Sequence, residues 1–167
     1  MASNDSSLFK KYINKVFVET GSCVGVGINR AIEAGFEEIY SIELSEKLYE
    51  VCCGYFKDNL KVHLYFGDSR FVLKDIVKNI NKPITFWLDA HRTGGLTVGE
   101  LTPPLFEELE QIKNHNIKTH TIMIDDLRCW GNDWNERLKK EILTINPNYK
   151  FIIEDGTFEK DVLVAVI

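Results

Sequence analysis

The sequence predicts an α/β fold: a seven-stranded, mostly parallel sheet with helices on both faces. Short segments rich in β-branched and aromatic residues alternate with longer segments of helical period, as a parallel sheet with crossover helices requires. The last two expected strands are joined only by residues 154–161, which are too few for a crossover helix. We therefore expect these two strands to form an antiparallel hairpin at one edge of the sheet.

The strands are expected, in chain order, at Val16–Glu19, Glu38–Glu43, Lys61–Phe66, Ile84–Leu88, Thr119–Ile124, Tyr149–Ile153 and Val162–Ile167. The first crossover helix follows a glycine-rich loop, and the second begins after Ser45, a candidate N-cap. Apolar stripes at helical spacing mark the second, fourth and fifth helices. The first two stripes comprise Leu48, Val51, Cys52, Tyr55 and Phe56, and Leu105, Leu109 and Ile112. Trp134, Leu138, Glu141 and Ile142 follow the helical spacing more loosely. Pro103 and Pro104 suit a first helical turn.

Composition limits the class of protein. The chain has 167 residues, 44% of them hydrophobic, so we expect one domain over residues 1–167. Its 20 basic and 25 acidic side chains give a net charge of −5, which provides no general attraction to nucleic acid or anionic membranes. Residues 1–7 lack the apolar core of a signal peptide, and no apolar run is long enough to span a membrane, so we expect a cytoplasmic protein.

The four cysteines show no metal-binding spacing. We expect free, mostly buried thiols at Cys23, Cys52, Cys53 and Cys129.

A ligand site is expected beyond the carboxyl ends of the parallel strands. The first strand runs into Glu19-Thr20-Gly21-Ser22-Cys23-Val24-Gly25-Val26-Gly27 and then a helix, so glycines and helix N–H groups would face a ligand. The second strand ends at Glu43, which could accept hydrogen bonds from a ribose. Asp68 and Ser69 follow the third strand and suit either an adenine contact or a helix cap. Two alternatives remain: the glycine-rich segment could be an ordinary strand-to-helix turn, and Glu43 could be a solvated surface acid.

These motifs resemble those of class I S-adenosylmethionine-dependent methyltransferases, and the resemblance covers nearly the whole chain. It implies a Rossmann-like sheet of order 3-2-1-4-5-7-6 with strand 7 antiparallel, and binding of S-adenosylmethionine. The implied cofactor-binding residues are Glu19, Gly21, Ser22, Gly25, Glu43, Leu44, Asp68, Ser69 and Asp89. Cys23 departs from the family, which usually has its second glycine there. A nicotinamide-dinucleotide fold is the rival interpretation, but the glycines lack the register of G-x-G-x-x-G.

Three aspartates end the next two strands. Asp89 follows the fourth strand, and Asp125 and Asp126 follow the fifth. Adjacent parallel strands would bring the three carboxylates close enough to repel one another unless a cation lay among them, and Mg²⁺ or another divalent ion suits three such oxygen donors. In the alternative interpretation, Asp89 only ends its strand, Asp125 is a loop acid and Asp126 is a helix N-cap. The arrangement resembles that of metal-dependent catechol and macrocin O-methyltransferases.

His91 is the candidate general base, since a neutral imidazole can take a proton from an acceptor hydroxyl at neutral pH. Asp89 is the second catalytic candidate. His63, His115 and His120 are interpreted as structural. Residues 92–99 contain three glycines and suit a mobile lid. Trp130 and Trp134 could wall a substrate pocket, and core packing is the alternative for Trp134. Arg92 and Arg128 could either meet an anionic substrate group or balance the acids.

The leading hypothesis is metal-dependent O-methylation of a hydroxyl on a sugar or other small molecule. A methyltransferase acting on a macromolecule is the alternative enzyme; nucleic acid and membrane are not expected as partners. A methyltransferase-like binding module without activity is the non-enzymatic alternative. Because the sheet would use the whole chain and leave no substrate cap, a homo-oligomer is also expected.

Overall fold

The computed structural model describes residues 6–90, 103–129 and 131–167. Its strands form a seven-stranded sheet of order β3-β2-β1-β4-β5-β7-β6, in which β7 runs antiparallel to both of its neighbours. The strands are β1 (Val16–Thr20), β2 (Glu38–Glu43), β3 (Val62–Phe66), β4 (Ile84–Leu88), β5 (Thr121–Ile124), β6 (Lys150–Glu154) and β7 (Val162–Val166). The predicted strand order and terminal hairpin are confirmed, and each strand end lies within two residues of its expected position.

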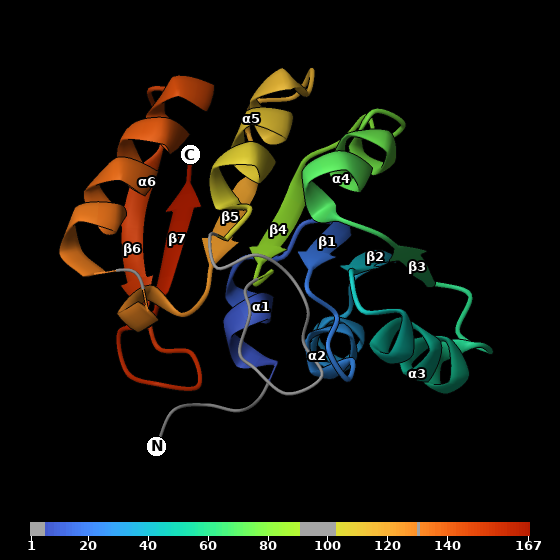
Figure 1. Cartoon of the computed structure of the whole chain (residues 1–167). Coiled ribbons are helices and arrows are strands. Elements are labelled where there is room, and N and C mark those ends of the chain that lie inside the picture. Colours follow the sequence, from blue (N-terminus) through green and yellow to red (C-terminus); the bar gives the residue numbers. More distant parts are fainter. Residues whose placement is uncertain (1–5, 91–102, 130) are drawn as a thin grey trace.

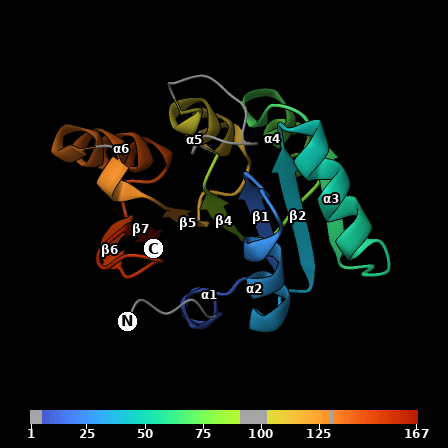
Figure 2. The ribbon, with the colours of Figure 1, turned by 60° about the horizontal axis from the view of Figure 1, so that its bottom comes forward.

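Helices cover both faces of the sheet (Figure 1). The helices are α1 (Ser7–Lys11), α2 (Val26–Ala34), α3 (Glu46–Phe56), α4 (Ser69–Val77), α5 (Leu105–Asn114), α6 (Gly131–Ile145) and the 3₁₀ turn η1 (Leu127–Cys129). α4, α5 and α6 pack on one face, and α1, α2 and α3 contribute to the core on the other (Figure 2).

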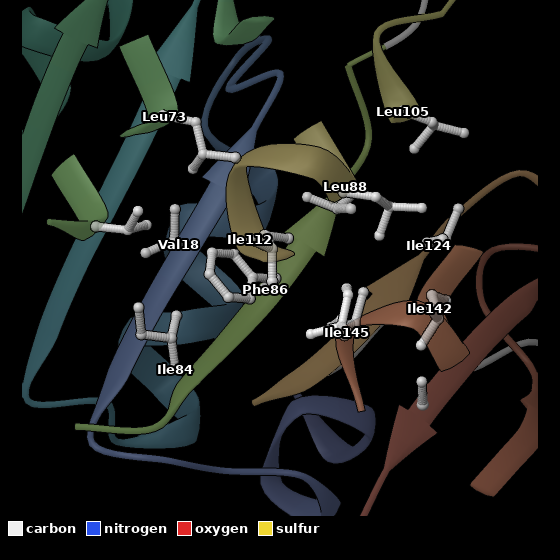
Figure 3. Close-up of a cluster of buried hydrophobic side chains, with 14 of the residues drawn as sticks. Val18, Leu73, Ile84, Phe86, Leu88, Leu105, Ile112, Ile124, Ile142 and Ile145 are labelled. Atoms are coloured by element: carbon white, nitrogen blue, oxygen red, sulfur yellow. The ribbon is translucent and has the colours of Figure 1, made fainter. Parts of the chain in front are cut away.

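The alternation of side chains along each strand divides the core into two layers. Val18 and Phe86 face α4 and α5, whereas Phe17 and Trp87 face α1 and α2. Figure 3 shows the first layer, with Ile112 of α5 lying beside Phe86. Because all five of these side chains are 3% exposed or less, each contributes about 1.5–3 kcal/mol through burial.

Two expectations about burial were wrong. In α3, Val51 and Tyr55 are exposed, because that helix buries only the narrower row of Leu48, Cys52 and Phe56. Cys52 is also the only fully buried cysteine of the four. Cys23 and Cys129 are exposed because they lie in the segments that follow β1 and β5, and such connecting segments run over the surface. The short helix α1 was not predicted; its Leu8 and Phe9 join the second core layer.

The direction of the strands determines where a site can form. β1 to β5 are parallel, so the segments that follow them meet at one edge of the sheet, which we call the carboxyl edge. β7 runs the other way, so the residue that precedes it, Asp161, lies at that edge too. No helix within the described ranges is long and apolar enough to cross a membrane.

Candidate active site

The loop between β1 and α2 lies against the ends of two neighbouring strands. Gly21 and Gly25 have φ angles of +86° and +82°. The N–H of Gly21 donates to the carbonyl of Ile42 at 2.9 Å, which holds the loop on β2. A Cβ on residue 21 would lie 2.7 Å from the carbonyl oxygen of Asp89, so only glycine fits there.

Cys23 adopts the conformation for which a glycine was expected. Its φ angle is +49°, in a region that costs a residue with a Cβ roughly 1–2 kcal/mol. Two hydrogen bonds hold it there: its N–H donates to Glu43 Oε2 at 2.8 Å, and its carbonyl accepts from the Cys52 thiol at 3.4 Å. The loop therefore keeps its left-handed turn at residue 23 without a glycine.

Glu19 is a buried acid beneath this loop. It is 2% exposed and points to the α2 face, where a Cβ on Gly27 would overlap its Oε1 atom. The Ser41 hydroxyl donates to Glu19 Oε2 at 2.5 Å, and Ser22 Oγ lies 2.6 Å from Ser41 Oγ. Burial raises the pKa of Glu19 to about 8, although the Ser41 hydrogen bond lowers it.

Glu43 is fixed by backbone donors at the end of β2. Its Oε2 accepts from the N–H of Cys23 and its Oε1 from the N–H of Ser45, both at 2.8 Å. The side chain is therefore not the freely solvated acid of the alternative interpretation, since Glu43 is 6% exposed. Each carboxylate oxygen keeps a second lone pair with which it can accept another hydrogen bond.

Asp68 takes the capping role. Its side chain accepts from the backbone N–H of Arg70 at 2.9 Å and also pairs with the Arg70 guanidinium, which holds the pKa of Asp68 below its usual range. Ser69 begins α4 and is buried. Leu44, which follows Glu43, is 37% exposed at the same edge of the sheet.

A cluster of acids surrounds Arg128 where β5 ends. One carboxylate oxygen each of Asp125, Asp126 and Asp161 lies within 4.8 Å of the other two. The Arg128 guanidinium forms ion pairs with Asp126 and Asp161, and it stacks on the Phe158 ring, 4.0 Å from the centroid. The predicted pair Asp125–Asp126 is thus brought together, and Asp161 takes the third place in this group instead of Asp89.

Asp89 lies near the same cluster, on its β4 side. The pKa of Asp125 is raised to about 7, mainly by burial and next by the charge of Asp89. A divalent cation would relieve this repulsion, and carboxylate oxygens are donors that suit it. The donor chemistry of Asp89 and Asp125 therefore fits a divalent cation, whereas Asp126 is paired with Arg128. His91, the lid at 92–99 and Trp130 lie outside the described residues.

Sequence reasoning missed two acids. Asp161 could have been found from the hairpin, because an antiparallel last strand begins at the edge where its parallel neighbours end. Glu108 lies on the buried stripe of α5, between Leu105 and Leu109, and is 0% exposed. The signal was an acid at an apolar position of the helical period.

Several solved structures that share this fold are methyltransferases or bind their methyl donor. The O-methyltransferase from Bacillus cereus in complex with S-adenosylhomocysteine (SAH) matches at a TM-score of 0.68 and 13% identity, over 97% of this chain and 78% of the other. Fibrillarin from Aeropyrum pernix, with natively bound S-adenosyl-L-methionine (SAM), matches at 0.65 and 12% identity, over 97% and 73%. A putative rRNA methylase from Clostridium thermocellum matches at 0.58 and 15% identity, over 96% and 93%.

These likenesses show the fold of class I SAM-dependent methyltransferases, as the motifs suggested. In sequence, no protein-family model and no curated protein matches the chain.

Proposed function

We propose that this chain is a SAM-dependent methyltransferase. The observation that carries the proposal is the arrangement of two buried acids, Glu19 and Glu43, around a left-handed glycine loop at the carboxyl edge. A ligand with a ribose and a cationic centre suits this arrangement, since it offers acceptors for hydroxyl groups and negative charge. The fold shared with SAM- and SAH-bound enzymes supports the same ligand.

In this proposal each predicted cofactor residue has a part. Glu43 would accept from the ribose hydroxyls through its remaining lone pairs. Asp68, Ser69 and Leu44 would border the adenine. The residues that would border the methionine part are Glu19, Gly21, Ser22, Gly25 and Asp89.

The acceptor we propose is a hydroxyl of a sugar or another small molecule. Its oxygen forms the new bond to the methyl carbon as the bond from that carbon to sulfur breaks, so the enzyme must align oxygen, carbon and sulfur. The hydroxyl proton would pass to His91, two residues beyond Asp89 at the end of β4.

A divalent cation would be held by Asp89 and Asp125. Asp126 would contribute an oxygen that is not engaged by its ion pair with Arg128. When bound, the cation would lower the pKa of the acceptor hydroxyl. The pair Asp89–Asp125 supports this part of the proposal because the two carboxylates repel each other.

Calorimetric titration with SAH, with and without a chelator and Mg²⁺, tests the cofactor. We expect binding by the wild type and much weaker binding by Glu43→Gln. Folded protein that binds neither SAM nor SAH would refute the proposal. Turnover of hydroxylated sugars and catechols should then require Mg²⁺ and fall in Asp125→Asn; turnover that withstands the chelator would remove the metal from the mechanism.

RNA is the second candidate acceptor, because a putative rRNA methylase shares the fold. The net charge of −5 opposes it. Labelled SAM offered with RNA and with the small-molecule panel would separate the two classes; label transferred only to RNA would replace the leading acceptor.

A further inference from the structure

Another buried acid lies on the opposite face of β1 from Glu19. Glu108, in the first turn of α5, is 0% exposed. Its nearest polar neighbours are the hydroxyls of Thr20, at the end of β1, and Ser69, at the start of α4. The end of β1 is therefore flanked by one buried carboxyl group on each face of the sheet.

The surroundings of Glu108 offer it little compensation for a charge. Within the described ranges, neither carboxyl oxygen of Glu108 has a partner in full hydrogen-bond geometry, and neither does Thr20 Oγ1. The charged groups that face it are Asp68 and Glu107, both acidic, and Asp68 is already paired with Arg70. An ionised carboxylate without a cationic partner is costly to bury, and burial raises the pKa of Glu108 to about 7.

Glu108 is held firmly in this position. One turn further along α5, the Gln111 amide donates to the carbonyl of Ser69 at 3.1 Å, and Gln111 Oε1 accepts from the N–H of Lys74 at 2.8 Å. These bonds fix α5 to the first turns of α4. Glu108 thus lies between Thr20, which directly precedes the proposed loop residue Gly21, and Ser69, a proposed adenine neighbour.

We propose that Glu108 is a positioning residue that keeps its proton in the free chain and releases it to solvent when the cationic methyl donor binds at the end of β1. The inference rests on the proposed function and adds a proton linkage to it. SAM carries one positive charge more than SAH, because its sulfur is a sulfonium. A nearby positive charge favours the carboxylate form, so SAM should displace more of the proton than SAH does.

Glu19 must be distinguished from Glu108, because its pKa is raised as well. The two differ in their partners. Glu19 accepts a short hydrogen bond from Ser41, whereas the Thr20 and Ser69 hydroxyls near Glu108 are not in full hydrogen-bond geometry with it. Glu108→Gln keeps the shape of the side chain and removes its titration. Glu107→Gln, at the exposed neighbouring position, is the control, since it removes an acidic charge that acts on Glu108 but leaves the Glu108 carboxyl group in place.

The experiment is calorimetry of SAM and SAH binding at pH 7 in two buffers of different ionisation enthalpy. We expect the wild type and Glu107→Gln to release more protons with SAM than with SAH. In Glu108→Gln this difference should disappear, with SAH affinity changed by no more than about threefold, or ~0.7 kcal/mol. An unchanged difference in Glu108→Gln, or one that vanishes only in Glu19→Gln, would overturn the proposal.

Infrared spectroscopy tests the free chain without any ligand. At pH 6, the carbonyl band of a protonated buried carboxyl should be present in the wild type and Glu107→Gln and reduced in Glu108→Gln. Equal bands in all three would overturn the proposal even if SAM binds. Failure of folded protein to bind either ligand would instead refute the proposed function, and the linkage with it.

Discussion

Gly27 and Glu19 depend on each other: the missing side chain of Gly27 in α2 leaves the space that the Glu19 carboxyl group fills from β1. Gly27→Ala should push that carboxyl group away from Ser41. Because the Glu19–Ser41 hydrogen bond is buried, we expect unfolding free energy to fall by about 1–3 kcal/mol and SAH binding to weaken. Urea denaturation and calorimetry measure the two effects.

Gly54→Ala is the control for this prediction. Gly54 lies inside α3, and a Cβ there meets nothing within 4 Å, so the change should stabilise the chain by about 0.5–1 kcal/mol. The double variant Glu19→Ala/Gly27→Ala should cost less than the sum of its two single changes. Strict additivity would mean that the two residues do not compete for space.

Glu43→Gln should weaken SAH binding by about 10-fold or more. The two oxygens of Glu43 accept one backbone N–H each, and a glutamine can accept only one of them, which costs about 1.5–3 kcal/mol for a lost charged hydrogen bond. The comparison is Glu38→Gln at the start of the same strand, where the partner is the partly exposed Lys82. Equal affinities in both variants would argue against a role for Glu43 in fixing the loop.

His120 should make the chain sensitive to acid. Its Nδ1 accepts from the N–H of Ile84 at 3.1 Å, so its Nε2–H donates to His115 Nδ1 at 2.9 Å. Burial lowers the pKa of His120 to about 4, helped by His115. A base with a lowered folded pKa contributes stability that is present above its unfolded pKa of about 6.5 and is lost as pH falls toward 4.

Urea midpoints measured between pH 8 and pH 4.5 check this effect. The difference in stability between the wild type and His120→Asn should shrink by a few kcal/mol over that range, because asparagine does not titrate. His63→Asn, at the partly exposed strand β3, is the control for replacing a histidine by asparagine. A constant difference for His120→Asn would contradict the assignment.

Arg128→Gln should destabilise the chain and increase its response to Mg²⁺. The variant leaves Asp161, which is 2% exposed, without its cationic partner, at a cost of about 1–3 kcal/mol since Arg128 is itself partly exposed. Three carboxylates within 4.8 Å would then lack the guanidinium, so Mg²⁺ should raise Tm more than in the wild type. Lys139→Gln removes a surface ion pair on α6 and should change little. Equal Mg²⁺ responses in all three proteins would mean that the Arg128 guanidinium does not compete with a cation for this cluster.

The sheet could be predicted because its signals are local. Short runs of β-branched and aromatic residues marked each strand, and the short connection before Val162 required a hairpin. The ends of β1 and β2 followed from the same reasoning, which is why Glu19 and Glu43 were found. Glu43 is bound to the loop that follows Glu19 through the Cys23 N–H, and no spacing in the sequence reveals that bond.

The parts that could not be predicted depend on contacts between distant segments. Arg128 pairs with Asp161, 33 residues away. Whether Arg128 binds an acid of the chain or a substrate anion depends on where the β6–β7 hairpin places Asp161, and the sequence near Arg128 does not show this. The sequence was compatible with either an adenine contact or a helix cap for Asp68. The position of Arg70, whose backbone N–H and guanidinium both donate to Asp68, shows that it is a cap. Helical period alone placed Tyr55 in the core, although α3 lies at the edge of the sheet and buries fewer of its residues.

The antiparallel direction of β7 has a consequence for the order of folding. β7 is inserted between β5 and β6, and the Asp161 that precedes it is the group that receives the Arg128 side chain and two backbone N–H groups of η1. An intermediate in which β1 to β5 have formed but β7 has not yet docked would already contain the glycine loop. It would lack the η1 turn after β5, because that turn is held in place by Asp161. Under the proposed function, the half of the site that binds SAM would therefore form before the half that holds the acceptor, and a partly folded molecule would bind the nucleoside without transferring the methyl group.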